Sequence, residues 1–472
     1  MILQSALGLV LLSGSALAGS KAPAHPQPVF HAEATIQPDS HLLRGQEAVD
    51  FLNKRPLVQA VATNGTLSIS QLKETLRKDP DFAIDVVNSK PLYTCQGLIP
   101  PSNASIKVQG ISASGPMMPP NTPKNAQGLP LLSSRPTSKK TILLDFDGCT
   151  ITKTWWNTGR APTIVTPPFD PAKDGVKFNA IEQEYVYGIW RAVAEDYAVF
   201  DVDVTTIDRG IDRIIKNFPG DEQVGTRLCI GGSSLDWYKK SAAGVSYLNT
   251  FGLAVDTPGF VFASSLENRP KWIWESASHE VGHTLGLSHD GDNKGPLYYG
   301  YDIDNWAPIM GVAHSREWST FDRGTYAYAS NPEDDFAVIG KYLKQIPDTE
   351  GNSQATATLL KSNVPVSGIL NIGDNADVFK INVVKGTRVE IRANTVSPWQ
   401  TYNQANLDLT LMISNINLGL ISPKDSFSAS AVFVAPVTGI YYVTVGRTEM
   451  VTKYGPNHSY GSVGTYTLAA KY

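Results

Sequence analysis

The chain has 472 residues, a hydrophobic content of 42% and a formal net charge of −4 at pH 7. This length predicts two or three domains of roughly 100–200 residues each. The mildly acidic balance and the lack of long basic runs argue against a nucleic-acid partner. No segment beyond the N-terminus is apolar for long enough to predict a membrane span.

Residues 1–18 have the pattern of a signal peptide, which predicts a secreted, extracellular protein. The stretch from Ile2 to Leu12 is mostly apolar, and Ala16-Leu17-Ala18 fits a small-x-small cleavage site. The alternative is a short N-terminal membrane anchor. Its apolar run falls well below the roughly 18 residues that a span needs, which favours the signal peptide.

Two further features agree with an oxidising, extracellular compartment. Asn-x-Ser/Thr sequons, which predict a glycoprotein, occur at Asn64, Asn103 and Asn457. The chain has three cysteines: Cys95, Cys149 and Cys229. In a secreted protein an odd count predicts one disulfide and one remaining thiol.

Residues 19–140 are expected to form a pro-segment followed by a flexible linker. Gln71–Lys78 could form a short helix within it. Residues 99–140 are rich in Pro, Ser, Asn and Gly. That composition is typical of a linker with no packed core.

Residues 141–346 are predicted to form a compact α/β domain. Asn179 and Glu182 fit a capping box that begins a long amphipathic helix, expected to end near Phe200. Short strand-like runs lie around it, at Thr141–Asp145, Asp201–Thr206, Arg227–Ile230, Val245–Leu248 and Phe260–Ala263. This alternation favours helices on a mostly parallel sheet. A closing helix is predicted for Asn331–Gln345, with Pro332 in its first turn.

The candidate metal site is formed by His279, His283 and His289. On a helix the first two imidazoles lie one turn apart on one face, which is the spacing of two zinc ligands. Gly286 can adopt a positive φ and turn the chain back, so that His289 becomes the third ligand. The fourth position stays open for water, as a catalytic zinc requires. Glu280 can reach that water without being a ligand itself.

The alternative is a histidine pair on a solvated helix. Only five histidines follow residue 140, and three of them lie within these eleven residues, which favours the metal site. We therefore predict one catalytic Zn²⁺, with Glu280 as the general base. Calcium could bind between Asp201 and Asp203 or between Asp374 and Asp377. Solvated carboxylates are the simpler interpretation of both pairs, so calcium is left unassigned.

The C-terminal part of the chain is predicted to be an all-β domain. Residues 347–362 form a polar linker, and residues 363–472 contain short β-type runs between Gly, Asn and Asp. The runs are Val378–Val383, Arg388–Arg392, Leu407–Ile413 and Ile440–Val445. Regular short strands with turn signals predict a β-sandwich of about 100 residues.

The motif HEVGHTLGLSHD at residues 279–290 resembles the metzincin zinc signature, and APIMG at residues 307–311 resembles the Met-containing turn that follows it. LLDFDGCTITKTWW and EDYAVFDVDVTT are similar to a secreted microbial branch of metzincins. GNSQATATLL, DNADVF and GIYYVTV are similar to a C-terminal pre-peptidase domain. The metzincin resemblance covers residues 141–345. It implies an α+β fold with a mixed, mostly parallel five-stranded sheet and Met310 as an apolar floor beneath the metal.

The resemblance also implies an endopeptidase of proteins or peptides, made as a zymogen. It identifies Gly244–Asn249 as an exposed antiparallel edge strand to which an extended substrate adds. It places the strands preceding Cys149 and containing Cys229 side by side, where these two cysteines could form a disulfide. Cys95 would then be the free thiol and could occupy the fourth metal position. The alternatives are a Cys95 without metal contact and latency by steric cover alone.

The roles of three further residues stay open. Tyr326 or Tyr328 could donate to the oxyanion, and Asp290 could contact groups around the metal. Packing and solvation are the alternatives for each of them.

Two other functions also stay open. One is a surface-binding or adhesion protein that keeps the fold, and the C-terminal domain could bind a surface or a large substrate in either case. The intact Glu280 argues against that function. The other is a zinc amidohydrolase acting on non-peptide amides, against which the long histidine motif with its Met-turn argues.

Overall fold

The computed structural model describes residues 41–55, 67–99, 118–175, 177–294, 298, 305–397, 406–424, 426–448, 450–452, 455–457 and 460–472. The predicted signal peptide and the sequons at Asn64 and Asn103 lie outside these residues, whereas Asn457 ends strand β21 (Gly455–Asn457). Within these ranges, no helix combines the length and the apolar character that a membrane crossing requires.

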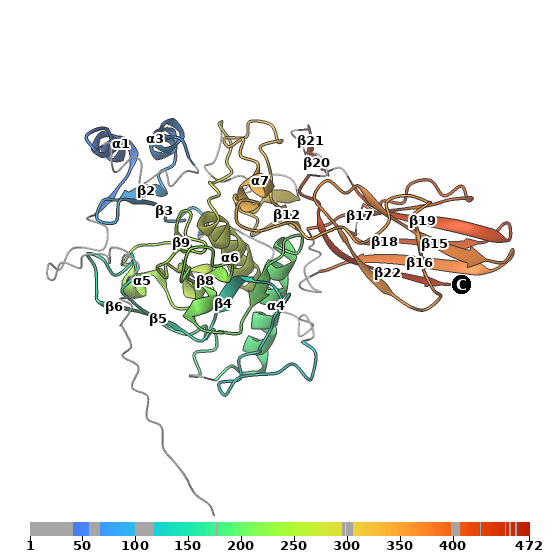
Figure 1. The fold of residues 1–472 in the computed structure, drawn as a ribbon, viewed down its shortest axis with the longest axis horizontal. Helices are drawn as coiled ribbons and strands as arrows, with labels where there is room; N and C mark the ends of the chain where they lie inside the picture. The colour runs from blue at the N-terminus through green and yellow to red at the C-terminus, as the bar shows by residue number, and fades with distance from the viewer. Residues whose placement is uncertain are drawn as a thin grey trace, which may run out of the picture. The chain divides into compact units, whose positions relative to one another are not determined.

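The larger part of the structure is built on an eight-stranded sheet with the order β1-β2-β3-β9-β10-β8-β4-β7. In that order the strands are Leu42–Leu43, Phe82–Asp85, Lys90–Tyr93, Gly244–Tyr247, Gly259–Val261, Val224–Ile230, Lys140–Asp145 and Asp203–Thr205. Figure 1 labels the strands β2, β3, β9, β8 and β4 of this sheet. The pairs β10–β8, β8–β4 and β4–β7 are parallel. Strand β9 is antiparallel to β10 and to β3. The sheet is larger than the five strands expected, because three strands from residues 41–99 extend it beyond β9.

Two helices that pack on this sheet follow from local sequence signals. The helix α4 (Ala180–Asp196) begins at the predicted capping box. The Asn179 side chain accepts the backbone N–H of Glu182, and the Glu182 side chain accepts the backbone N–H of Asn179. The helix α6 (Pro270–Thr284) starts with proline, whose missing N–H costs nothing at that position. All its residues are buried, and it packs against α4 and the sheet.

The closing helix is shorter than predicted. Helix α7 spans only Asp335–Ile339, and its N-cap is Asp334, whose side chain accepts from the backbone of Ala337. Pro332 is therefore not in its first turn. Glu333 instead accepts the backbone N–H of Ser288, within the histidine motif at residues 279–290. The smaller elements are α5 (Ser234–Trp237), η1 (Ile211–Arg213), η2 (Ala263–Leu266), β5 (Cys149–Thr152), β6 (Thr163–Thr166), β11 (Trp306–Pro308), β12 (Trp318–Thr320) and β20 (Met450–Thr452).

The N-terminal segment is packed on the part of the chain that carries α4 and α6. Its helices α1 (Gly45–Asn53) and α3 (Ile69–Lys78) bury Leu52 and Leu72 in the same apolar core as Ile142 and Val281. Residues 118–140 also depart from the linker expected there. Leu129 and Leu132 are buried in that core, and the backbone of Leu132 donates to Thr206 Oγ1. The packed region therefore begins well before Thr141.

The disulfide between Cys149 and Cys229 is confirmed, with the two Cα atoms 5.9 Å apart. It joins the first residue of β5 to β8. Parallel pairing of β4 with β8 places Asp145 opposite Cys229, which brings the two cysteines within reach. Cys95 is free and buried.

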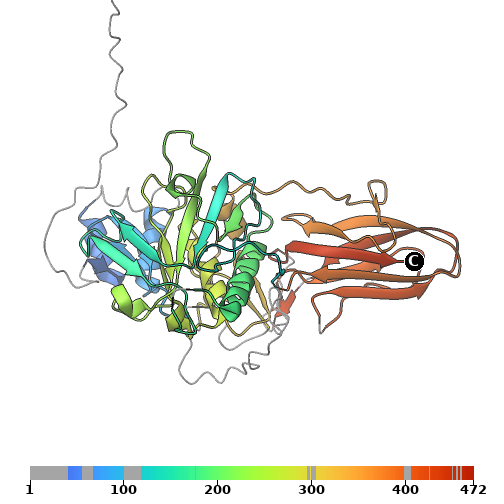
Figure 2. The same ribbon diagram turned by 90° about the horizontal axis from the view of Figure 1, so that it is seen from below.

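The C-terminal part is a β-sandwich, as predicted, and Figure 2 shows its two sheets facing each other. One sheet has the order β13-β15-β19-β17, formed by Thr358–Leu359, Ala376–Val383, Gly439–Arg447 and Leu409–Ile413. The other has the order β14-β22-β16-β18, formed by Val366–Leu370, Gly464–Lys471, Arg388–Thr395 and Ala429–Val434. Apolar side chains that alternate along these strands form a core of their own.

The sandwich is tied to the end of α4 by hydrogen bonds. Thr465 donates its backbone N–H and its hydroxyl to Glu195. Asn406 donates to Asp196 over 2.6 Å. Both carboxyl groups are buried, so these contacts replace the water that the groups lose on folding.

Candidate metal centre

The structure brings the three predicted histidines together with Cys95. The Nε2 atom of His283 lies 3.0 Å from that of His279 and 3.2 Å from that of His289. The Sγ atom of Cys95 lies 3.5, 3.4 and 3.5 Å from the Nε2 atoms of His279, His283 and His289. All four side chains are buried, and together they could hold a metal ion.

These spacings fit a tetrahedral zinc site. With Zn–N bonds of about 2.0–2.1 Å and a Zn–S bond of about 2.3 Å, tetrahedral angles place two nitrogens about 3.3 Å apart and the sulfur about 3.5 Å from each nitrogen. The observed separations of 3.0–3.2 Å and 3.4–3.5 Å lie close to both values. A three-histidine, one-thiolate donor set is also one that zinc accepts.

Local geometry explains how the histidines meet. His279 and His283 lie one turn apart on α6, and the helix ends directly after them at Thr284. Gly286 has a φ of +102°, which L side chains rarely adopt. A Cβ atom there would also lie 2.3 Å from Asn249 Oδ1. The predicted turn at Gly286 is therefore confirmed, and it returns His289 to the helix face.

Each imidazole is held at its second nitrogen. His279 Nδ1 is 2.9 Å from the carbonyl oxygen of Ile309, and His283 Nδ1 is 2.8 Å from that of Leu287. His289 Nδ1 is 2.7 Å from Asp79 Oδ2. An acceptor at Nδ1 favours the tautomer whose Nε2 lone pair is free for a metal.

Burial keeps two of these rings neutral. It holds the pKa of His279 and of His283 well below the usual value. Burial, followed by the Glu280 charge, raises the pKa of the Cys95 thiol. A metal ion held by this cluster would oppose that shift, because a coordinating thiol is deprotonated.

Glu280 lies beside the histidines and is completely buried. Among the described residues, no partner meets full hydrogen-bond geometry with its carboxylate oxygens, but interactions with Ser246 and Cys95 act to lower its pKa. Burial outweighs them and raises the pKa to about 8. Gly244 of β9 makes room for it, since a Cβ atom at that position would lie 2.1 Å from Glu280 Oε1. A buried carboxyl group with a raised pKa beside a metal-type cluster is a candidate for a functional acid or base.

Met310 and Asp290 are buried next to the histidine cluster. Met310 is fully buried. Its sulfur lies close to Gly282, which stands between the two helical histidines in the sequence. A Cβ atom added at Gly282 would be 2.5 Å from that sulfur. This placement agrees with an apolar floor. Asp290 is buried, donates its backbone N–H to the carbonyl of Met310, and accepts from Asn331. Burial and the nearby Asp322 raise its pKa.

The N-terminal segment covers the side of the site where a substrate was expected. Strand β3 pairs antiparallel with β9, joining Leu92 to Tyr247 and Tyr93 to Ser246. Strand β9 is therefore not an exposed edge in this chain. The Tyr93 ring stacks on His283, with centroids 4.1 Å apart and an interplanar angle of 11°. The chain's own segment thus occupies the position predicted for an extended substrate.

The other tyrosines singled out in the sequence lie elsewhere. Tyr326 is buried and donates to the carbonyl of Gly291, and Tyr328 is 47% exposed. Tyr298 instead has its hydroxyl 3.3 Å from His289 Nε2, and it donates to Asp81 Oδ2 over 2.5 Å. No local sequence signal distinguishes Tyr298, because its proximity to the histidines depends on tertiary folding.

The two aspartate pairs considered as calcium sites differ in whether their carboxylates come together. Asp203 is fully buried and pairs with Arg209, whereas Asp201 is exposed, so this pair does not converge. Asp374 and Asp377 lie together with Asp348, with one carboxylate oxygen of each within 4.8 Å of the others. Asp374 Oδ2 and Asp377 Oδ1 are buried and lack partners among the described residues.

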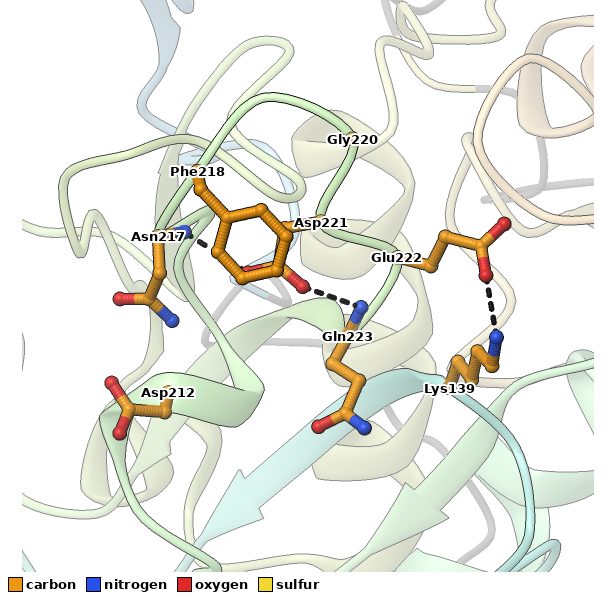
Figure 3. Close-up of a pocket in the computed structure, with 8 residues that line it drawn as sticks. All are labelled: Lys139, Asp212, Asn217, Phe218, Gly220, Asp221, Glu222 and Gln223. Atoms are coloured by element: carbon orange, nitrogen blue, oxygen red, sulfur yellow. Dashed lines mark hydrogen bonds and ion pairs between the residues drawn. The ribbon is translucent and has the colours of Figure 1, made fainter. Parts of the chain in front are cut away.

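A separate surface hollow carries no comparable cluster (Figure 3). It is lined by Lys139, Asp212, Asn217, Phe218, Gly220, Asp221, Glu222 and Gln223. Asp221 accepts the backbone N–H groups of Asn217 and Gln223, and Lys139 pairs with Glu222. The carboxylates of Asp221 and Glu222 are therefore already paired with groups of the protein.

Residues 235–335 match the model of the metallopeptidase family M12B, reprolysin-like. The resemblance to metallopeptidases is thereby confirmed for this segment, which contains the histidines and Glu280. No curated protein matches the chain in a sequence search.

Among solved structures, the chain is similar to the pre-peptidase C-terminal domain of a collagenase from Bacillus anthracis. The identity is 20%, with 27% of this chain and 100% of that chain covered and a TM-score of 0.18. It is also similar to PliG, a periplasmic inhibitor of g-type lysozyme from Aeromonas hydrophila. There the identity is 9%, with 24% and 94% covered and a TM-score of 0.17.

Proposed function

We propose that this protein is a secreted zinc-dependent endopeptidase that is made as a latent precursor. The observation that carries the proposal is the convergence of three imidazole Nε2 atoms and the Cys95 sulfur at zinc-like spacings. Secretion is proposed from the signal-peptide pattern of residues 1–18. The M12B match supports a peptidase.

His279, His283 and His289 would hold the ion, which when bound activates a water and polarises the scissile carbonyl. Glu280 would accept the proton of that water and pass it to the leaving amine. Strand β9 would orient the substrate through main-chain hydrogen bonds, once β3 has left it. This mode suits extended segments of proteins and peptides.

In the precursor, Cys95 would take the fourth position and exclude water, while β3 fills the substrate strand. Latency would thus have a chemical part and a steric part. The C-terminal sandwich is proposed to bind a surface or a large substrate, since its core is separate from that of the catalytic part.

The test uses Glu280→Ala and His289→Ala in the processed chain, with Glu267→Ala, an exposed residue, as a matched control. Glu280→Ala should keep stoichiometric zinc because all three imidazoles remain, while peptide hydrolysis falls by at least about 10²-fold. His289→Ala should weaken zinc binding. Full activity of Glu280→Ala would refute the mechanism, and unchanged zinc affinity of His289→Ala would refute the ligand set.

A further inference from the structure

The third histidine depends on the pro-segment for its outer partner. His279 and His283 donate to carbonyl oxygens of the catalytic part itself. His289 instead meets Asp79, which lies 210 positions earlier in the chain and directly after helix α3. Both side chains are almost fully buried, at 2% and 8% exposure, so water does not compete for this contact.

At this position a carboxylate fixes the tautomer of His289 more strictly than an amide would. An ionised carboxylate only accepts hydrogen bonds, so it requires the proton of His289 to lie on Nδ1 and leaves Nε2 free. An asparagine could instead donate to Nδ1, which would put the proton on Nε2, the atom that faces the cluster. Outer partners of this kind commonly change metal affinity by about 10–100-fold.

Asp79 is also fixed relative to Cys95. Asp81 donates its backbone N–H to Asp79 Oδ1 over 2.9 Å. Asp81 Oδ2 in turn accepts the backbone N–H groups of Gln96 and Gly97 over 3.0 and 3.1 Å. The residue that touches His289 Nδ1 and the thiol that faces its Nε2 therefore belong to one hydrogen-bonded unit.

We propose that Asp79 is a positioning residue of the metal centre, so that the pro-segment completes the zinc site as well as covering it. The inference rests on the proposed function. The precursor is then the form that captures zinc most tightly. Removal of the pro-segment withdraws the thiol and the carboxylate together, and the mature site holds its metal with three histidines, one of which has lost its outer partner.

The experiment measures zinc affinity by competition with a chromophoric chelator, not hydrolysis. The full chain carries Cys95→Ser, so that the thiol does not dominate binding, and is compared with the same chain carrying Asp79→Asn in addition. Glu74→Gln, on the exposed face of α3, is the matched control. Asp79→Glu tests rescue by a carboxylate. Cobalt replaces zinc in parallel, because its visible absorption spectrum reports ligand geometry.

We expect Asp79→Asn to weaken zinc binding by about 10–100-fold and to change the cobalt spectrum, with unchanged thermal unfolding of the metal-free chain. Glu74→Gln should have no effect, and Asp79→Glu should recover part of the affinity. If the Cys95→Ser chain binds zinc equally well with and without Asp79→Asn, the inference is overturned while the proposed function stays intact.

A second comparison needs no Asp79 variant and covers the case in which Asp79→Asn does not fold. The processed chain should bind zinc more weakly than the Cys95→Ser precursor, and equal affinity would again overturn the inference. A Cys95→Ser precursor that bound no zinc at all would instead overturn the proposed function.

Discussion

Gly244→Ala is the substitution whose effect can be worked out most directly from the structure. The new Cβ atom would lie 2.1 Å from Glu280 Oε1 and 2.6 Å from its Cδ and Cγ atoms. Ordinary contact begins near 3.4 Å, so the carboxylate has to move by about 1.3 Å. A misplacement of about 1 Å can cost about 10²-fold in rate, which corresponds to about 2.7 kcal/mol of barrier.

The assay is hydrolysis of a short peptide by the processed chain, with kcat and KM determined separately and zinc content measured on the same sample. We expect kcat to fall by about 10²-fold at unchanged zinc content, because the nearest atoms to the new methyl group belong to Glu280 and not to a histidine. Gly439→Ala is the control, since no atom lies within 4 Å of its added Cβ. A normal kcat with full zinc would refute the assignment of Glu280 as the base, and a change confined to KM would point to β9 instead.

Three further outcomes are expected. Cys95→Ser should raise peptide hydrolysis by the precursor above that of the wild-type precursor. The rate should stay below that of the processed chain, because β3 remains paired with β9. Activity equal to that of the wild-type precursor would indicate that steric cover alone causes latency. Burial raises the pKa of Asp196 to about 8, so the folded chain retains a proton that the unfolded chain releases near pH 4. The unfolding free energy should therefore fall by up to about 1.4 kcal/mol per pH unit between pH 5 and 8, and a slope unchanged by Asp196→Asn in thermal unfolding would contradict this. Calcium should raise the melting temperature by binding to Asp348, Asp374 and Asp377. The increase should be larger above about pH 7, because burial raises the pKa of Asp377 to about 7. A calcium-induced increase that persists in Asp377→Asn would exclude the site.

Features encoded by neighbouring residues could be predicted from the sequence. The capping box of α4 and the helical pairing of His279 with His283 follow from spacings of three and four residues, which helix geometry fixes. The turn at Gly286 follows because few other residues adopt a positive φ. The shortened α7 shows the limit of such signals, because Glu333 is used to accept the Ser288 backbone N–H.

Local periodicity was therefore enough to predict the histidine cluster, the position of Glu280 beside it and the alternating strands of the sandwich. The residues that surround the cluster could not be predicted in this way, because they are brought there by long-range folding. Asp79, Tyr93, Cys95 and Tyr298 reach the histidines from both sides of the motif along the chain. Their contacts arise because β3 pairs with β9 and places the N-terminal segment across the site. Long-range strand pairing of this kind has no fixed spacing in the sequence.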